Sequence, residues 1–197
     1  MLSGNSFYKT ISLSVPGIHN ILNALACVAV CNEYGIEKEN IKNALLKYTG
    51  AHRRFEYKGS FSGVNVYDDY GHHPTEILAT ANALKQKKYN KSWVIFQPHT
   101  YSRTKTLLQD FAKALTLFDN IIITDIYAAR EKNTFGIHSR DLVNEISKLG
   151  RNAYYIESFN EIVNFVKSNA LNNDLVLTMG AGTITNLSGM LVESTEE

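Results

Sequence analysis

The stretch of sequence that decides the fold is Val64-Asn65-Val66-Tyr67-Asp68-Asp69-Tyr70-Gly71-His72-His73-Pro74-Thr75-Glu76. Its first four residues are largely apolar or aromatic, which is typical of a β-strand. Pro74 favours the first position of a helix, and Glu76 then lies in the first turn of that helix. A strand that ends in two carboxylates, a phenol and two imidazoles, just before a helix begins, is typical of a ligand-binding edge in α/β folds.

The two adjacent acids are predicted to have different tasks. Strand alternation places Asp68 on the face of Val64 and Val66, whereas Asp69 lies on the opposite face with Tyr67. The alternative interpretation is that both acids are turn or capping residues beside solvent-exposed histidines.

The composition favours one or two compact globular domains, with 197 residues of which 44% are hydrophobic and 20% charged. The net charge of +1, without a long run of one sign, does not indicate binding to nucleic acid or to an anionic membrane. The longest apolar run, Ala24 to Cys31, is too short to span a bilayer, and the first residues lack the pattern of a signal peptide. We therefore expect a cytoplasmic protein whose two cysteines, Cys27 and Cys31, are buried reduced thiols.

Residues 1–50 are expected to form a strand over 7–15 and helices over 18–34 and 38–48. The buried stripe of the first helix is predicted to consist of Ile21, Leu22, Leu25, Val28 and Ala29. These elements are too few for an independent core, so they are interpreted as the end of a larger domain.

Residues 51–197 alternate strands and helices in the rhythm of a parallel sheet. Strands are expected at 64–69, 92–97, 120–125, 153–156 and 174–178. Helices are expected near 75–86, 105–117, 140–149, 160–168 and 184–192. The predicted fold class is therefore α/β, with a Rossmann-like, mostly parallel sheet flanked by helices and preceded by the strand and two helices of residues 1–50.

Polar residues follow the predicted strands, in the segments 68–73, 97–103 and 125–131, and a glycine-rich turn follows at 179–183. The carboxyl ends of parallel strands meet at one edge of a sheet, so these segments should lie close together. Gly180-Ala181-Gly182 resembles half of a dinucleotide-binding fingerprint, although a tight turn from strand to helix explains it equally well.

Two further pairs of polar residues are candidates for binding. Asn20 and Asn23 lie three residues apart on one helix face, where an amide can both donate to and accept from a purine edge. Capping of the helix by Asn20 is the alternative. Arg53 and Arg54 can hold a phosphate or carboxylate through forked hydrogen bonds, or they form a solvated basic pair.

Taken together, four motifs resemble the Mur ligase family, in the same order and from about residue 7 to residue 191. They are Pro16-Gly17-Ile18-His19-Asn20-x-x-Asn23-Ala24, Arg53-Arg54-Phe55, Asp68-Asp69-Tyr70-Gly71-His72-His73-Pro74-Thr75-Glu76 and Gln97-Pro98-His99-Thr100-Tyr101-Ser102-Arg103-Thr104.

The resemblance implies an ATP-dependent ligase that converts a carboxylate of a UDP-sugar to an acyl phosphate, which the amine of an amino acid then attacks. It is strongest to members that join L-alanine to UDP-N-acetylmuramate in peptidoglycan precursor synthesis. The chain contains no G-x-x-x-x-G-K-[ST] phosphate loop. Residues 1–50 are therefore expected to be the end of the central ATP-binding domain, and residues 51–197 the C-terminal domain. Mg²⁺ would be held mainly by the absent central domain, and the chain alone is expected to be inactive.

The resemblance also implies roles for individual residues on the nucleotide side. Asn20 and Asn23 match residues on the adenine side of ATP. Arg54 matches the arginine that contacts the nucleotide, and Asp69 matches the acid that binds its ribose.

Tyr70, His99 and Arg103 match residues that place the incoming alanine, and His73 lies near the reacting centre by position, as His72 does. A forked cation such as Arg103 suits an α-carboxylate. Relatives often carry arginine where this chain has Thr100, so carboxylate binding would depend more on Arg103.

Three alternatives stay open at this point. The first is the related ligase that recycles murein tripeptide, for which the incoming amine belongs to a peptide. The second is a stand-alone module that binds a nucleotide or another metabolite at the same sheet edge. The least favoured is a metal site built from Asp68, Asp69, His72 and His73, because adjacent residues seldom aim at one ion.

Overall fold

The computed structural model describes residues 10–15 and 17–193, except for the side chain of His19. The chain divides into two compact units, Met1–Ala51 and His52–Glu197, and each is described by itself. Among the described residues, no helix is both long enough and apolar enough to cross a membrane.

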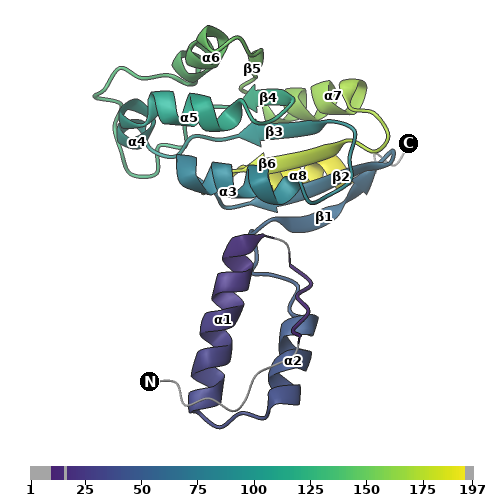
Figure 1. The fold of residues 1–197 in the computed structure, drawn as a ribbon. Helices are drawn as coiled ribbons and strands as arrows, with labels where there is room; N and C mark the ends of the chain where they lie inside the picture. The colour runs from purple at the N-terminus through teal and green to yellow at the C-terminus, as the bar shows by residue number, and fades with distance from the viewer. Residues whose placement is uncertain (1–9, 16, 194–197) are drawn as a thin grey trace. The chain divides into compact units, whose positions relative to one another are not determined.

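In its described part, the first unit contains α1 (Ile18–Glu33) and α2 (Lys38–Lys47) (Figure 1). The helices pack through a small apolar cluster of Val28, Ile41 and Leu45. Gly35 follows the end of α1 with a φ of 71°, a conformation that glycine adopts without steric cost. Both helices therefore form where the sequence predicts them.

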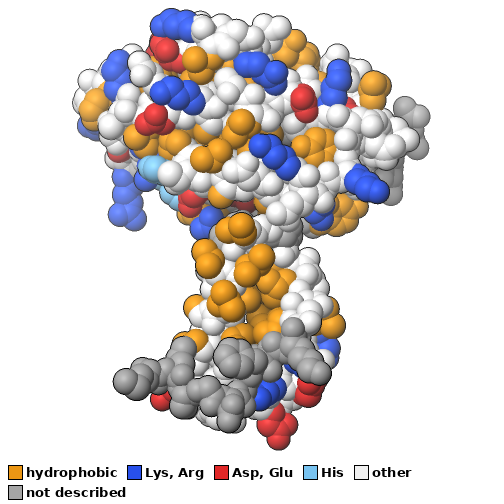
Figure 2. Space-filling model, viewed as in Figure 1, with side chains coloured by type: hydrophobic (Ala, Val, Ile, Leu, Met, Phe, Trp, Pro, Cys, Tyr) orange, Lys and Arg blue, Asp and Glu red, His pale blue; other side chains and the backbone are white. Residues whose placement is uncertain are grey.

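Three predictions for this unit are wrong in the described residues. Residues 10–15 form no strand, because no neighbouring strand is present to accept their backbone hydrogen bonds; residues 7–9 lie outside the described residues. Of the predicted stripe on α1, only Val28 is buried, because α2 can cover only one side of the helix. Figure 2 shows apolar side chains gathered along this unit. Cys27 and Cys31 are free, but Cys27 is exposed and Cys31 only partly buried.

The described part of the second unit contains one six-stranded sheet with the order β1-β2-β6-β3-β4-β5. Its strands are β1 (Glu56–Phe61), β2 (Val64–Asp69), β3 (Ser92–Phe96), β4 (Asn120–Ile123), β5 (Ala153–Tyr155) and β6 (Leu175–Met179). Only the pair of β1 and β2 is antiparallel, and the other neighbouring strands run parallel. The predicted fold class, a mostly parallel α/β sheet, is confirmed.

Helices cover both faces of this sheet (Figure 1). They are α3 (Pro74–Leu84), α4 (Tyr101–Thr106), α5 (Leu108–Leu115), α6 (Ser139–Lys148), α7 (Phe159–Asn169) and α8 (Thr185–Val192). One apolar cluster joins the sheet to α3, α5 and α6, and a second joins it to α7 and α8. Neighbouring residues of β3 alternate between them: Val94 and Phe96 belong to the first cluster, Trp93 and Ile95 to the second. A strand covered on both faces needs the continuous apolar run seen here.

Two elements differ from the sequence prediction. Strand β1 was not among the predicted strands, because Glu-Tyr-Lys-Gly-Ser-Phe is an edge strand whose residues are exposed or only partly buried. The helix expected over 105–117 is two helices, α4 and α5, which meet at Leu107.

The strand register determines where ligand-binding side chains can gather. Asp69 pairs with Met179, Met179 with Phe96, and Phe96 with Ile123. The carboxyl ends of β2, β6, β3 and β4 are therefore level with one another. The polar segments that follow β2, β3 and β4 consequently emerge side by side at one edge of the sheet.

The surroundings of Gly180, in the turn after β6, and of Gly189, in α8, predict different effects of an alanine substitution on stability. Gly180 has a φ of 148°, and a Cβ added there would lie 2.7 Å from the backbone oxygen of Gln97. Gly180→Ala should destabilise the second unit by about 1–3 kcal/mol, because the backbone contact cannot relax easily. In Gly189, inside α8, an added Cβ meets nothing within 4 Å. Gly189→Ala is the matched control and should be neutral or stabilising by up to about 1 kcal/mol.

Urea unfolding followed by the fluorescence of Trp93, the single tryptophan and a buried residue of β3, measures both changes. Equal midpoints for Gly180→Ala and the unchanged chain would contradict the prediction.

Candidate functional site

A row of aromatic rings lies along the carboxyl edge of the sheet. The ring centroids of Tyr70 and His72 are 5.3 Å apart, those of His72 and His99 are 5.7 Å apart, and those of His99 and Tyr127 are 5.6 Å apart. Tyr70 and His72 follow β2, His99 follows β3, and Tyr127 follows β4. Three loops distant in sequence thus build one continuous surface.

The position of Tyr127 is fixed by the backbone. Its amide donates to the Pro98 oxygen at 2.8 Å, and its own oxygen accepts from the Thr100 amide at 2.9 Å. His99 and Tyr127 therefore form an isolated parallel bridge beyond the ends of β3 and β4. Sequence analysis noted the loop that contains Tyr127 but did not select this residue, because only the bridge shows that its ring stacks on His99.

Arg103 lies in α4, and its Nη1 is 3.3 Å from Nδ1 of His99. Because a guanidinium only donates hydrogen bonds, Nδ1 is the acceptor and the proton of neutral His99 lies on Nε2. The start of α4 is tied to the loop after β4, since the Ser102 amide donates to Oε2 of Glu131 at 2.9 Å and the Ser102 hydroxyl donates to Oε1 at 2.5 Å. Glu131 is a second residue of this edge that sequence analysis did not select.

His99 is kept neutral by its surroundings. Burial, followed by the charges of Arg103 and His72, lowers the pKa of His99, and Glu131 opposes this with a smaller effect. An imidazole with a pKa below its usual value of about 6.5 is unprotonated at neutral pH.

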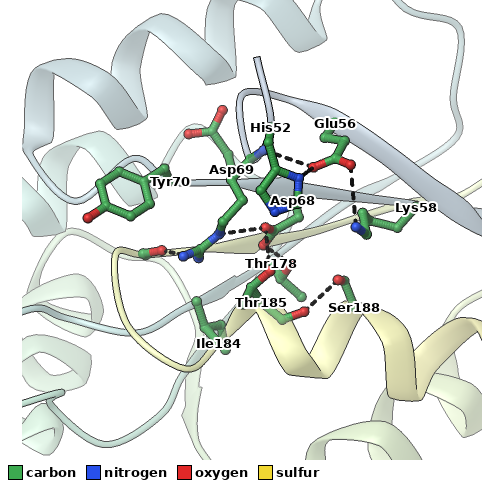
Figure 3. Close-up of polar contacts among 12 residues, drawn as sticks. His52, Glu56, Lys58, Asp68, Asp69, Tyr70, Thr178, Ile184, Thr185 and Ser188 are labelled. Atoms are coloured by element: carbon green, nitrogen blue, oxygen red, sulfur yellow. Dashed lines mark hydrogen bonds and ion pairs between the residues drawn. The ribbon is translucent and has the colours of Figure 1, made fainter. Parts of the chain in front are cut away.

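The two adjacent acids point to opposite faces of the sheet, as strand alternation predicts. Asp68 is fully buried and accepts from Nε of Arg53 at 2.9 Å and from the hydroxyls of Thr178 at 2.7 Å and Thr185 at 2.8 Å (Figure 3). A metal site shared by Asp68 and Asp69 is incompatible with this arrangement. Among the described residues, no group of three or more His, Cys, Asp or Glu side chains could hold a metal ion.

Asp69 is only 4% exposed and accepts three hydrogen bonds. They come from the amides of Gly71 at 2.7 Å and Phe55 at 2.9 Å and from the hydroxyl of Thr80 at 3.2 Å. Burial raises the pKa of Asp69, and these donors offset part of the rise. The structure thus gives Asp69 a task in holding the turn after β2, which agrees with the alternative interpretation of this acid as a turn residue.

The two arginines at the start of this unit differ in exposure. The side chain of Arg53 is 13% exposed, whereas that of Arg54 is 51% exposed and has a long contact of 3.5 Å with Glu76. Burial alone would raise the pKa of Glu76, but the hydrogen bond from the His72 amide and the charges of His72 and Arg54 outweigh it and lower the pKa. Arg54 is therefore the arginine that is available to a ligand.

The two histidines also differ. His73 is the N-cap of α3: its Nδ1 accepts from the Thr75 amide, and its own amide donates to Glu76. His72 instead lies between the rings of Tyr70 and His99. His73 is therefore engaged in capping α3, whereas His72 belongs to the row of rings, and only the orientation of the two side chains distinguishes them.

The glycine-rich turn after β6 is filled by the protein's own side chains. Oε1 of Gln97 accepts from the Ile184 amide at 3.0 Å, and Nε2 of Gln97 is 3.3 Å from the Thr183 hydroxyl. A Cβ at Gly182 would lie 2.6 Å from Cγ of Tyr127. These contacts account for the glycines without a dinucleotide, which favours the tight-turn interpretation.

Residues 53–182 match the family model described as "Mur ligase, glutamate ligase domain". This match covers more than half of the chain. The chain belongs to the Mur ligase family.

Two UDP-N-acetylmuramate–alanine ligases are similar to this chain over nearly its whole length. A UDP-N-acetylmuramate–L-alanine ligase from Acetivibrio thermocellus is 50% identical over 98% of this chain and 41% of its own length. The crystal structure of UDP-N-acetylmuramate–alanine ligase from Thermotoga maritima superposes with a TM-score of 0.79, at 32% identity, over 94% of this chain and 39% of that one. The Mur ligase chain thus spans about two fifths of the length of these relatives.

The predicted site residues of the Mur ligase chain fall in both units. Asn20 and Asn23 lie in the first two turns of α1, in the first unit. Gly17 is the N-cap of α1, so Asn20 lies inside the first turn and not at the N-cap position. The other predicted residues, Arg54, Asp69, Tyr70, His73, His99 and Arg103, belong to the second unit and lie at or beside the carboxyl edge of its sheet.

Removing the charge of Arg103 should raise the pKa of His99. In Arg103→Gln the imidazolium form is no longer disfavoured by the neighbouring guanidinium, so the pKa should move toward its usual value. Because the pKa is lowered on folding, His99 binds fewer protons when folded, and its contribution to stability is lost as the pH falls below about 6.5. This loss should shrink in Arg103→Gln.

An NMR titration of the His99 ring proton checks this result. Arg151→Gln is the control, since Arg151 donates to the Phe118 oxygen at the amino edge of the sheet and should leave the titration of His99 unchanged. An unchanged or lower pKa of His99 in Arg103→Gln would show that the charge of Arg103 does not lower this pKa.

Proposed function

We propose that this chain supplies the amino-acid-binding part of an ATP-dependent ligase that joins L-alanine to UDP-N-acetylmuramate. The observation that carries the proposal is the 50% identity to a ligase of that name along 98% of the chain. The gathering of Tyr70, His72, His99 and Arg103 on one sheet edge agrees with it.

In this proposal Arg103 binds the carboxylate of alanine. One of its donors contacts His99, and the planar guanidinium has further donors to form a forked pair. Such a pair fixes the orientation of the amino acid, which is what an amine attacking an acyl phosphate most needs. The neutral His99 adds a directional N–H on Nε2 without a second positive charge that would repel the ammonium group.

On the nucleotide side, we propose that Arg54 contacts ATP, with Asn20 and Asn23 of the first unit on the adenine. Arg54 fits this role because its guanidinium is exposed and weakly held. Asp69 fits a ribose less directly, since its carboxylate already accepts three hydrogen bonds and a ribose hydroxyl would add a fourth. ATP would supply the phosphoryl group that activates the sugar carboxylate. Mg²⁺ would be held mainly by a part of the ligase outside this chain.

Experiments can distinguish two other functions, ligation of murein tripeptide and binding by a stand-alone module. A murein peptide ligase from Psychrobacter arcticus superposes with a TM-score of 0.63 at 23% identity, which supports a shared fold alone. Comparing ligation of alanine and of murein tripeptide by a full-length ligase distinguishes this function. A stand-alone binding module should bind ATP or alanine without further domains, which calorimetry on the chain measures.

The chain alone should neither hydrolyse ATP nor form an amide. The reason is the missing phosphate loop, which supplies backbone donors and a lysine to the transferred phosphoryl group. Phosphate release is measured against a blank without protein. Release above the blank that disappears in Arg54→Ala would contradict the prediction.

In a full-length ligase that carries this region, Arg103→Lys should raise KM for alanine and leave KM for ATP nearly unchanged. Lysine keeps the charge but loses the planar fork. Arg103→Ala should have the larger effect, about 1.5–3 kcal/mol, or roughly 10- to 150-fold in KM.

Steady-state kinetics with each substrate varied in turn measures both changes, with Arg151→Lys as the control at the opposite edge of the sheet. If Arg103→Ala leaves the dependence on alanine unaltered, Arg103 does not bind its carboxylate.

A further inference from the structure

We propose that Arg53 is a positioning residue, which uses a buried ion pair with Asp68 to fix Arg54 and Tyr70 at the ligand edge. The inference rests on the proposed function, because it explains how the nucleotide contact of Arg54 is held in place. Arg53 itself does not touch the substrate in this proposal.

The anchor is a fork of two hydrogen bonds from one guanidinium. Nε of Arg53 donates to Oδ2 of Asp68 at 2.9 Å, and Nη2 donates to the Gly180 oxygen at 2.6 Å. Asp68 is itself fixed by the hydroxyls of Thr178 on β6 and Thr185 on α8. Arg53 is therefore tied to β2, to the turn after β6 and to α8 at the same time.

Backbone hydrogen bonds connect the anchored Arg53 to Tyr70 at the ligand edge. The Arg53 oxygen accepts from the Tyr70 amide at 2.6 Å, and the Arg53 amide donates to Glu56 at 2.8 Å. Arg53 and Phe55 have φ angles of 56° and 49°, which non-glycine residues adopt only at a cost in energy. Arg54 lies between these two residues, so its direction depends on the contacts that hold them.

Asp69 holds the residue on the other side of Arg54, because it accepts from the Phe55 amide at 2.9 Å. Asp68 thus holds the residue before Arg54 through a side chain, and Asp69 holds the residue after it through the backbone. Arg54 is fixed on both sides while its own side chain stays exposed.

The charges of this cluster also assign different tasks to the two arginines. The guanidinium carbons of Arg53 and Arg54 lie 5.0 Å and 5.6 Å from the centroid of the Tyr70 ring. Asp68 neutralises Arg53 at 2.9 Å, whereas the contact of the more exposed Arg54 with Glu76 is longer, at 3.5 Å. Glu56, which accepts from the Arg53 amide, is also contacted by His52 and Lys58. Arg54 consequently provides the positive charge that an anionic ligand can reach.

The first test uses this chain and measures hydrogen exchange. Arg53→Gln with Asp68→Asn removes both charges together, so no unpaired charge is left buried. The Tyr70 amide should then exchange about ten times faster or more, because its acceptor, the Arg53 oxygen, becomes mobile. The Phe55 amide should also exchange faster, because the segment that carries it is no longer held by Arg53, while the amides of β4 keep their rates. Lys148→Gln with Glu145→Gln, which removes an exposed ion pair on α6, is the matched control and should change none of these rates.

The second test uses a full-length ligase that carries this region and compares four forms: unchanged, Arg53→Gln with Asp68→Asn, Arg54→Ala, and all three substitutions. The paired substitution should raise KM for ATP by roughly 5- to 50-fold, which corresponds to losing a well-placed charged contact. In the Arg54→Ala background the same substitutions should have almost no further effect, because Arg53 acts through Arg54.

Three results would overturn the inference: unchanged exchange at Tyr70, equal acceleration of all amides, or the same rise in KM with and without Arg54. Failure of the proposed function gives a different result, since Arg54→Ala alone would then leave KM for ATP unchanged. In that case the exchange measurement still decides whether Arg53 fixes Tyr70.

Discussion

The constraint on which this structure depends is the burial of two neighbouring carboxylates at the end of β2. A buried charge is costly unless it is paired and hydrogen-bonded, and adjacent strand residues cannot share one partner because they face opposite sides of the sheet. Asp68 finds Arg53, Thr178 and Thr185 on the side of α8. Asp69 finds two backbone amides and Thr80 on the side of α3. Satisfying both acids therefore fixes both helical layers against the strand that begins the site.

This constraint distinguishes the residues that are held mainly by the protein from those whose surface is exposed at the site. The acids, Arg53 and Gln97 have their hydrogen-bonding groups engaged within the protein. Tyr70, His72, Arg103 and Arg54 keep part of their surface exposed at the same edge. Rigid support beneath exposed polar groups is the arrangement that precise binding requires, since groups fixed in advance lose less entropy when they bind.

Most of the fold could be predicted because its signals are local. The apolar runs Trp93–Phe96 and Ile121–Ile123 permit little besides buried parallel strands, and the predicted bounds of β2 agree with those observed. Strand β1 was missed because an edge strand needs no apolar run. The stripe on α1 was overestimated because its burial depends on which elements lie beside it, and the helix's own sequence does not specify them.

The meeting of the polar segments at one edge of the sheet could be predicted, whereas the orientation of their side chains could not. Strand periodicity correctly separated Asp68 from Asp69, but a carboxylate that binds ribose and one that binds backbone amides look the same in sequence. The sequence alone does not distinguish His72 from His73, whereas the structure shows that His73 caps α3. Tyr127 was missed because its contact with His99 depends on two strands that are far apart along the chain.

The sheet order has a consequence for how the molecule is made. Strand β6 is the last strand of the sheet to be synthesised, yet it lies between β2 and β3 near the centre. A nascent chain that ends before Leu175 holds the β1–β2 ribbon and the β3–β4–β5 sheet as separate pieces. β2 and β3 then each present an unpaired edge of the kind that promotes aggregation. Joining the pieces depends on contacts between residues more than 100 positions apart, such as Thr178 with Asp68, which slows folding. The ligand edge is therefore incomplete until β6 has joined the sheet.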